Sequence, residues 1–173
     1  MLNPEKVKIT GHLTIRVLDG KTRNEKRRIE TPNLVVNGTK TALVSMLCNT
    51  NCDKLQAWGI GVGTDNTPPA GSQTDLQCAA GKMFKKKYDT SGRNFTEDGH
   101  LELQMTVTTD EGIQAVGDYY CEAGLFTRGD AEWAKTPDPM TGSKMLARQL
   151  HALIHKDGTI SLEYTWRLQI AIS

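Results

Sequence analysis

The stretch ISLEYTWRLQIAI, residues 160–172, decides the fold class. Its apolar side chains occupy every second position without a break: Ile160, Leu162, Tyr164, Trp166, Leu168, Ile170 and Ile172. Because successive side chains of a strand point to opposite faces, the pattern predicts one long strand with a single buried face. At roughly 3.3 Å per residue this strand would span about 40 Å. We interpret this long regular strand as a structural element of the fold rather than as part of a catalytic cleft.

The composition is that of one globular domain with balanced charge. The chain has 173 residues, of which 21 are Lys or Arg and 20 are Asp or Glu, giving a formal net charge of +1. This balance argues against general electrostatic binding to nucleic acid or to an anionic membrane. No apolar run reaches the roughly 20 residues of a membrane helix, and residues 1–10 lack the apolar core of a signal peptide. We therefore expect a protein of the cytoplasm with its four cysteines reduced.

An N-terminal β-hairpin is the second clear pattern. Residues 7–17 alternate between apolar and polar side chains, Asp19-Gly20 is a favoured tight-turn dipeptide, and residues 21–29 return as a strongly charged strand. Charges suit an exposed strand edge that resists unwanted pairing. We therefore divide this single domain into a charged hairpin arm, residues 1–32, and a β-sandwich part, residues 33–173. The arm is predicted to contact neighbouring molecules through four basic residues: Arg23, Lys26, Arg27 and Arg28.

Residues 33–173 carry one helix signal among several strand signals. Apolar residues four apart predict a short helix over about residues 39–49, capped by Asn37 or Thr39. Residues 145–155 fit a helix or a strand, and we favour a strand because Asp157-Gly158 predicts a hairpin turn into residues 160–172. Strand–helix–strand alternation is absent from the pattern. The predicted fold class is therefore mainly β: an antiparallel β-sandwich or barrel-like domain with one short helix and an N-terminal β-hairpin arm.

The run Gly59-Ile-Gly-Val-Gly-Thr64 shares its glycines with nucleotide-binding loops. Such loops need a helix N-terminus beyond the glycines or a Gly-Lys-Ser/Thr ending, whereas Asp65, Asn66 and a proline pair follow here. We interpret the run as a strand whose glycine face admits another backbone or a large side chain.

Motifs for metal binding and catalysis are weak. Cys48 and Cys52 are four residues apart, but a zinc site needs further ligands at short spacing. His151 and His155 lack the glutamate of a metalloprotease motif, and we interpret them as an ordinary exposed pair. The sequence shows no serine elbow, Cys–His signature or convincing carboxylate pair. We therefore predict no catalytic residue, no metal site, no cofactor and no enzymatic activity.

Two charged motifs receive structural interpretations. A basic segment with interleaved aromatic residues would suit phosphates and bases, but the balanced net charge favours a solvated strand edge or a patch that meets an acidic partner. Its residues are Lys82, Phe84, Lys85, Lys86, Lys87 and Tyr88. Arg128-Gly129-Asp130 is the tripeptide of integrin ligands, and we interpret it as turn chemistry.

The order of several segments resembles a family of small structural proteins of tailed bacteriophages. Three marks carry the resemblance and together cover about residues 33–172. The first is Asn33-Leu-Val-Val-Asn-Gly-Thr-Lys-Thr-Ala-Leu43, and the second is the glycine run 59–64 followed by a Pro/Ala loop and Thr74-Asp75-Leu76. The third is Glu122-Ala-Gly-Leu-Phe126, then Met145-Leu-Ala-Arg148, Ile154-His-Lys-Asp-Gly158 and Tyr164-Thr-Trp166. In the second mark Thr precedes Asp, which departs from the family's order.

This resemblance implies a non-catalytic virion component. We expect a tail subunit, in the baseplate or at an adaptor or fibre-attachment position, whose partners are other virion proteins and further copies of itself. Trp133, between Glu132 and Lys135, is a candidate interface anchor, with a core position as its alternative. We expect no membrane or nucleic-acid partner, and location in the virion after assembly in the host bacterial cytoplasm.

Two other functions remain open at the level of sequence. One is a capsid decoration or cement protein. The other is a tail module that binds a host receptor or surface glycan, with aromatic residues stacking on sugars: Trp58, Tyr119, Tyr120 and Trp133.

Overall fold

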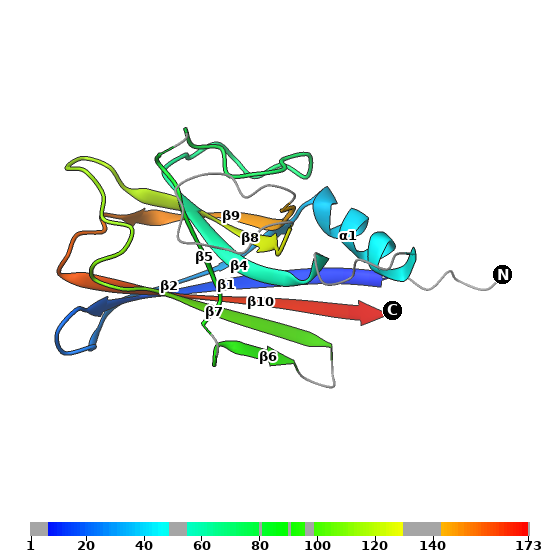
Figure 1. The fold of residues 1–173 in the computed structure, drawn as a ribbon, viewed down its shortest axis with the longest axis horizontal. Coiled ribbons are helices and arrows are strands. Elements are labelled where there is room, and N and C mark those ends of the chain that lie inside the picture. Colours follow the sequence, from blue (N-terminus) through cyan, green and yellow to red (C-terminus); the bar gives the residue numbers. More distant parts are fainter. Residues whose placement is uncertain are drawn as a thin grey trace.

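A computed structural model describes residues 7–48, 55–79, 81–89, 91–95, 99–129 and 143–172. These residues form ten strands and one longer helix (Figure 1). In chain order the elements are β1 Val7–Asp19, β2 Glu25–Pro32, β3 Leu34–Val35, α1 Asn37–Cys48, β4 Ala57–Gly63, β5 Phe84–Lys87, β6 Arg93–Phe95, β7 His100–Val107, β8 Tyr120–Thr127, β9 Met145–Ile154 and β10 Ile160–Ile172.

The strands form two five-stranded antiparallel sheets. Sheet A has the order β2-β1-β10-β7-β6, and sheet B has the order β3-β9-β8-β4-β5. The predicted mainly β class with one short helix is confirmed, and of its two versions the sandwich is correct, because the sheets do not close into a barrel. The helix α1 begins at Asn37 and ends at Cys48, close to the predicted range.

The main core lies between the two sheets. Sheet A contributes Leu13, Leu103, Tyr164 and Trp166, none of which is exposed, and sheet B contributes residues such as Ile60. A smaller apolar cluster lies on the opposite face of sheet B and is formed by Val36, Leu76, Met83, Phe126 and Met145. Sheet B is therefore covered on both faces, by sheet A on one and by segments that include Leu76 and Met83 on the other.

Strand β10 is the centre of sheet A. It pairs with β1 from Val7↔Ile172 to Asp19↔Ile160, and with β7 on its other side. The predicted buried face is present in its middle, where the alternating apolar side chains are buried, but Ile170 is 44% exposed. The opposite face of β10 is not uniformly exposed to solvent, because Ser161 and Glu163 are buried beneath side chains of the N-terminal hairpin.

The N-terminal hairpin is present, but it does not project as an arm. Its strand β1 lies inside sheet A between β2 and β10, and Leu13 and Ile15 belong to the main core. Only β2 occupies a sheet edge with mostly exposed side chains. The expected division between an arm and a β-sandwich part at residue 32 therefore falls inside one continuous sandwich.

The glycine strand and the ambiguous segment both follow the predictions. In β4, a Cβ atom added to Gly61 would lie 2.9 Å from a ring carbon of Phe126 and 2.9 Å from Cγ of Lys85, so a large side chain does approach the glycine face. Residues 145–154 form the strand β9, as favoured. The proposed cap Thr39 is buried instead, and its hydroxyl donates to the Leu146 carbonyl of β9, which ties α1 to sheet B.

Candidate functional site

The four basic residues predicted as an interface all have partners within the chain. Arg23 donates from Nη1 to Ser161 Oγ at 2.7 Å and from Nη2 to Glu163 Oε1 at 2.6 Å. Its φ of 61° lies in the left-handed region, which is strained for a residue with a side chain. These two contacts on β10 therefore hold the hairpin turn in place.

The other three basic residues behave similarly. Lys26 Nζ lies 2.9 Å from Asp19 Oδ2, and Arg27 donates to the Leu153 carbonyl at 3.2 Å. Arg28 donates to both carboxylate oxygens of Glu25 at 3.0 Å, and together with Arg16 it lowers the pKa of Glu25 to about 2. The hairpin charges thus neutralise one another along an exposed strand edge, which disfavours strand addition from another molecule.

The candidate anchor Trp133 lies outside the described residues, as do Cys52 and Asp130. Of the tripeptide, Gly129 has the left-handed backbone that the predicted turn role favours, whereas the contact of Arg128 was not predicted. Arg128 lies over the Trp58 ring at 4.9 Å, and Gly129 adopts a φ of 72°.

A buried ion pair between β8 and β9 organises the outer face of sheet B. Glu122 and Arg148 both have fully buried side chains, and Arg148 Nε donates to Glu122 Oε2 at 2.9 Å. Buried charges are tolerated only where pairing and hydrogen bonds replace the lost water. The glycine at position 63 makes room for this carboxylate, because a Cβ there would lie 2.4 Å from Glu122 Oε1.

The Glu122–Arg148 pair holds the long loop of residues 64–79. Glu122 accepts hydrogen bonds from the backbone N–H groups of Gln77 and Cys78, both at 3.1 Å. Arg148 donates from Nη1 to the Thr67 carbonyl at 2.8 Å and to Gln73 Oε1 at 3.1 Å. Side chains of β8 and β9 therefore hold the loop within the chain.

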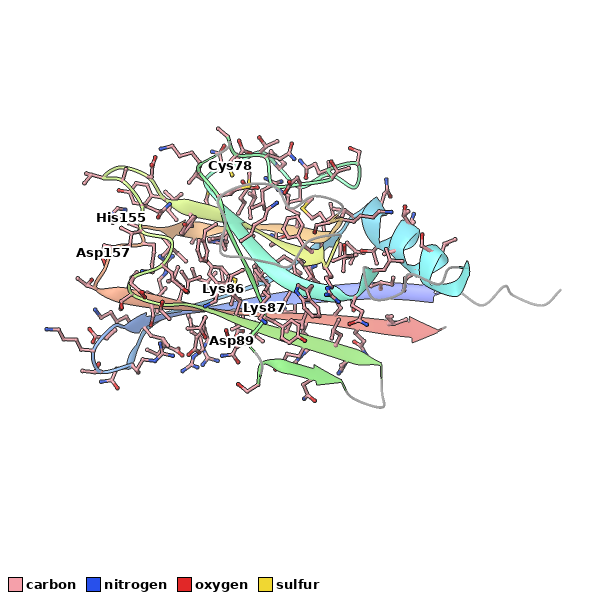
Figure 2. The ribbon with its side chains drawn as sticks, in the orientation of Figure 1. Cys78, Lys86, Lys87, Asp89, His155 and Asp157 are labelled. Atoms are coloured by element: carbon pink, nitrogen blue, oxygen red, sulfur yellow. The ribbon has the colours of Figure 1, made fainter. Side chains whose placement is uncertain are left out.

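The basic segment meets acidic residues of its own chain. Lys85 is 1% exposed, its Nζ lies 2.6 Å from Asp75 Oδ1, and it stands 4.3 Å from the centre of the Phe126 ring. Lys86 pairs with Glu111 at 3.0 Å. The predicted solvated strand edge is therefore wrong at Lys85, and contact of this segment with an acidic partner molecule stays a prediction. Lys86 and Lys87 are labelled in Figure 2.

Cys78, Cys121 and His151 are poorly suited to nucleophilic or acid–base chemistry. Burial raises the pKa of Cys78, on the outer side of sheet B (Figure 2), to about 12, and burial also raises the pKa of Cys121. Contrary to the predicted exposed pair, His151 packs against Tyr164 with ring centres 6.0 Å apart, and burial lowers its pKa to about 4. Among the residues described, no group of three or more His, Cys, Asp or Glu side chains is placed to hold a metal ion.

The aromatic residues considered for sugar stacking are mostly engaged in packing. Tyr120 is buried, and Trp58 makes an edge-to-face contact with Tyr88 at 5.5 Å in addition to its contact with Arg128. Tyr119 is 43% exposed. The described part of the chain thus offers one exposed ring of the four proposed.

A surface that sequence patterns did not single out is the loop of residues 108–119, between β7 and β8. Val116 is 100% exposed and Ile113 is 59% exposed, although both are apolar. Contiguous exposed apolar groups mark interaction sites more often than isolated ones. The sequence feature that could have identified this surface is the presence of Ile113 and Val116 in a Gly- and Asp-rich segment. That segment has neither the period of a strand nor that of a helix.

The base of this loop is braced by buried polar groups. Tyr120 donates its hydroxyl to the Gly112 carbonyl at 3.0 Å, and the Gln114 N–H donates to the Lys156 carbonyl at 2.9 Å. The buried Lys156 ammonium donates to the carbonyls of Thr109 at 3.2 Å and Asp157 at 2.8 Å, and burial lowers its pKa. These contacts attach Thr109, Gly112 and Gln114 of the loop to β8 and to the segment between β9 and β10.

An apolar groove of about 350 Å³ opens between the sheets beside α1. Its walls come from both sheets and the helix, and most of the lining side chains are aliphatic. The lining residues are Ile9, Thr39, Ala42, Leu43, Leu55, Gln56, Ala57, Gly99, His100, Leu101, Leu146, Leu168 and Ile170. Such a groove suits an apolar side chain of a partner better than a charged or polar ligand.

Comparison with protein-family models, with curated proteins and with solved structures gave no match. None of the helices in the described ranges is long and apolar enough to cross a membrane.

Proposed function

We propose that this chain is a non-enzymatic structural protein of a tailed bacteriophage virion. It acts as a tail component, in the baseplate or at an adaptor or fibre-attachment position. Its mechanism is symmetric assembly with copies of itself and with other virion proteins.

The observation that carries this proposal is the meeting of all three marks of the phage resemblance at one place. Glu122 and Arg148 come from two segments of the third mark, and their ion pair holds the loop of the second mark. The first mark joins the same unit, because the Asn37 N–H donates to the Gly71 carbonyl at 2.8 Å and Val36 packs in the cluster with Leu76. Segments that are far apart in the sequence thus contact one another and form one structural unit.

Loops that are held in place within the subunit suit assembly. A loop that is already fixed in the free subunit loses less conformational entropy when it meets a partner, so more of the contact energy is available for binding. The buried pair holds the loop 64–79, and hydrogen bonds with Lys156 and Tyr120 hold Thr109, Gly112 and Gln114 in the loop 108–119. A scaffold with two preorganised loops is what a subunit of a rigid assembly requires.

Labelling of purified particles tests the proposal. Antibody against the chain, visualised by immunogold electron microscopy, should mark the tail of the phage that carries the gene. Labelling of the head at high density would instead support a capsid decoration or cement protein. Particles that carry none of the chain would refute the virion role altogether.

Complementation tests the structural basis of the role. In a phage that lacks the gene, a plasmid copy with Glu122→Gln should restore fewer complete particles than a wild-type copy. Glu102→Gln, which alters an exposed ion pair with Arg167, is the matched control and should restore normal numbers. Equal restoration by both variants would show that the fixed loop 64–79 is not needed for assembly.

A further inference from the structure

A seam of side-chain contacts joins β2, at the edge of sheet A, to β9 in sheet B. Gln149 donates from Nε2 to Thr31 Oγ1 at 3.1 Å, and Arg27 donates from Nη1 to the Leu153 carbonyl at 3.2 Å. His151 lies on β9 between these two contacts, and its ring packs against sheet A. The imidazole therefore occupies the middle of the seam.

The His151 ring has one nitrogen paired and one buried nitrogen without a partner. Nδ1 lies 2.9 Å from the Ala152 carbonyl oxygen, which can only accept, so Nδ1 carries the hydrogen of the neutral ring. Nε2 is buried and has no hydrogen-bond partner within the described ranges. A second proton, on Nε2, would place a positive charge beside the buried Tyr164 ring, where the lost hydration is not replaced.

The ionisable groups that face His151 do not balance such a proton. From β2 the facing charge is the Arg27 guanidinium, which disfavours a second cation. From β10 the facing group is the Tyr164 hydroxyl, with Tyr120 of β8 near it, and burial raises the pKa of both. The Glu122 carboxylate of β8 lies on the outer face of sheet B, in the buried ion pair described above.

Strand β2 is the weaker side of the seam. It is an edge strand that pairs with β1 alone, and its side chains from Glu25 to Arg28 are exposed. Strand β9 is held on both sides, by β3 and by β8. Separation of the seam therefore costs least when β2 is the strand that moves.

We propose that protonation of His151 in acid releases β2 from β9 and frays this edge of sheet A, while the rest of the sandwich stays folded. At neutral pH the ring is uncharged and the seam is closed. Release of β2 exposes Ile29, which packs against the main core in the closed seam. This conformational switch goes beyond the proposed function and does not depend on the virion role.

The direction of the switch follows from proton binding in the two states of the seam. In the closed seam, burial and the Arg27 charge lower the pKa of His151 from 6.5 to about 4, although peptide groups of Ala152 and Glu122 favour the charged ring. In the open seam the ring is solvated, and its pKa returns toward the ordinary value. The open state therefore takes up the proton first, and opening becomes more favourable as the pH falls from about 6.5 to 4.

Hydrogen exchange of the backbone amides of β2 tests the proposal. Their protection factors, corrected for the intrinsic exchange rate at each pH, should fall roughly tenfold or more between about pH 7 and pH 5. Near-UV circular dichroism at the lower pH should remain native, which shows that the loss is local. His151→Phe keeps a ring but takes up no proton, and it should retain the protection of β2. Equal losses in the wild type and in His151→Phe would refute the switch.

A titration of the ring tests the proposal with His151 left in place. Arg27→Gln removes the facing charge and keeps an N–H donor for the Leu153 carbonyl, so it should raise the pKa of His151 and reduce the loss of protection in acid. Arg28→Gln is the matched control, because Arg28 pairs with Glu25 rather than with β9, and it should leave both quantities unchanged. The NMR signals of the His151 ring measure the titration.

Three further results would overturn the proposal. A His151 ring that titrates near pH 6.5 would show that it is solvated at neutral pH. Equal pKa shifts in Arg27→Gln and Arg28→Gln would show that Arg27 does not face the ring. Protection of β2 that equals that of β10 at every pH would show that β2 separates only when the whole sandwich unfolds.

Discussion

At the scale of single residues, the buried Glu122–Arg148 pair shows how two charges can be placed inside the protein. Both side chains are fully buried, and their hydrogen bonds are shared with the loop 64–79. A buried ion pair gains little stability over apolar residues of similar size, but removal of one partner leaves the other charged and buried. We infer that the pair specifies where the loop lies.

Glu122→Gln should therefore lower the free energy of unfolding by about 3–5 kcal/mol. The amide cannot neutralise Arg148, and its NH₂ group would face N–H donors that the carboxylate now accepts from. Urea unfolding followed by circular dichroism measures the change.

The control for Glu122→Gln is Glu102→Gln, at an ion pair in which the Arg167 side chain is 58% exposed. This variant should cost between about 0 and 1 kcal/mol. Equal losses in the two variants would mean that the buried pair has no special role.

Gly61→Ala should destabilise the protein by about 1–3 kcal/mol, because the added Cβ would lie 2.9 Å from the Phe126 ring in a packed cluster. Gly71→Ala is the matched control, since its Cβ would meet no atom closer than 3.8 Å. The difference in thermal midpoint between the two variants checks the prediction. Equal midpoints would show that the cluster can relax around a methyl group.

Protonation of His151 should lower the free energy of unfolding in acid. Burial lowers its pKa from 6.5 to about 4 in the folded protein, so the unfolded chain takes up a proton first as the pH falls. The folded state should lose on the order of 2–3 kcal/mol between about pH 6.5 and pH 4 through this residue. His151→Phe should remove this part of the pH dependence, measured as urea midpoints across that range. An unchanged profile would contradict the assignment.

At the scale of elements, β10 shows what a period of two can and cannot predict. The alternation correctly identified the strand and its buried centre at Tyr164 and Trp166. It could not show where the covering sheet ends, which leaves Ile170 exposed. Nor could it show that Arg16 and Arg23 cover Glu163 on the other face, because those contacts depend on tertiary pairing with the hairpin.

Trp166→Ala and Ile170→Ala should separate these two parts of β10. Trp166 is completely buried in the core, and its truncation should cost about 3–5 kcal/mol or prevent folding. Ile170→Ala should cost less than about 1 kcal/mol because the side chain is partly exposed. Unfolding in urea measures both, and comparable losses would mean that the buried face continues to the end of the strand.

The shortest strands could not be predicted from sequence patterns. The strands β5 and β6 have four and three residues, too few for a period to be recognised. In β5 the sequence is almost all lysine, and Lys85 is buried because Asp75 and the Phe126 ring replace its water. The position of that carboxylate depends on the loop 64–79 and could not be inferred from spacing.

At the scale of the whole molecule, sequence reasoning predicted the sandwich but not which charged side chains find partners within the chain. The basic residues selected on the hairpin are engaged by their own chain, as shown by Arg23 with Glu163 and Arg27 with the Leu153 carbonyl. The exposed loop tip at Val116 and the groove beside α1 arise only when both sheets are assembled. The charge pattern of the hairpin therefore reflects contacts within the chain.

We propose that this sandwich is a building unit of a phage tail. The most direct measurement is the quantity of the chain in purified particles, determined by mass spectrometry against a labelled standard. We predict a fixed, low copy number set by the rotational symmetry of the tail, retained after the heads are removed. Absence of the chain from purified particles would contradict the account.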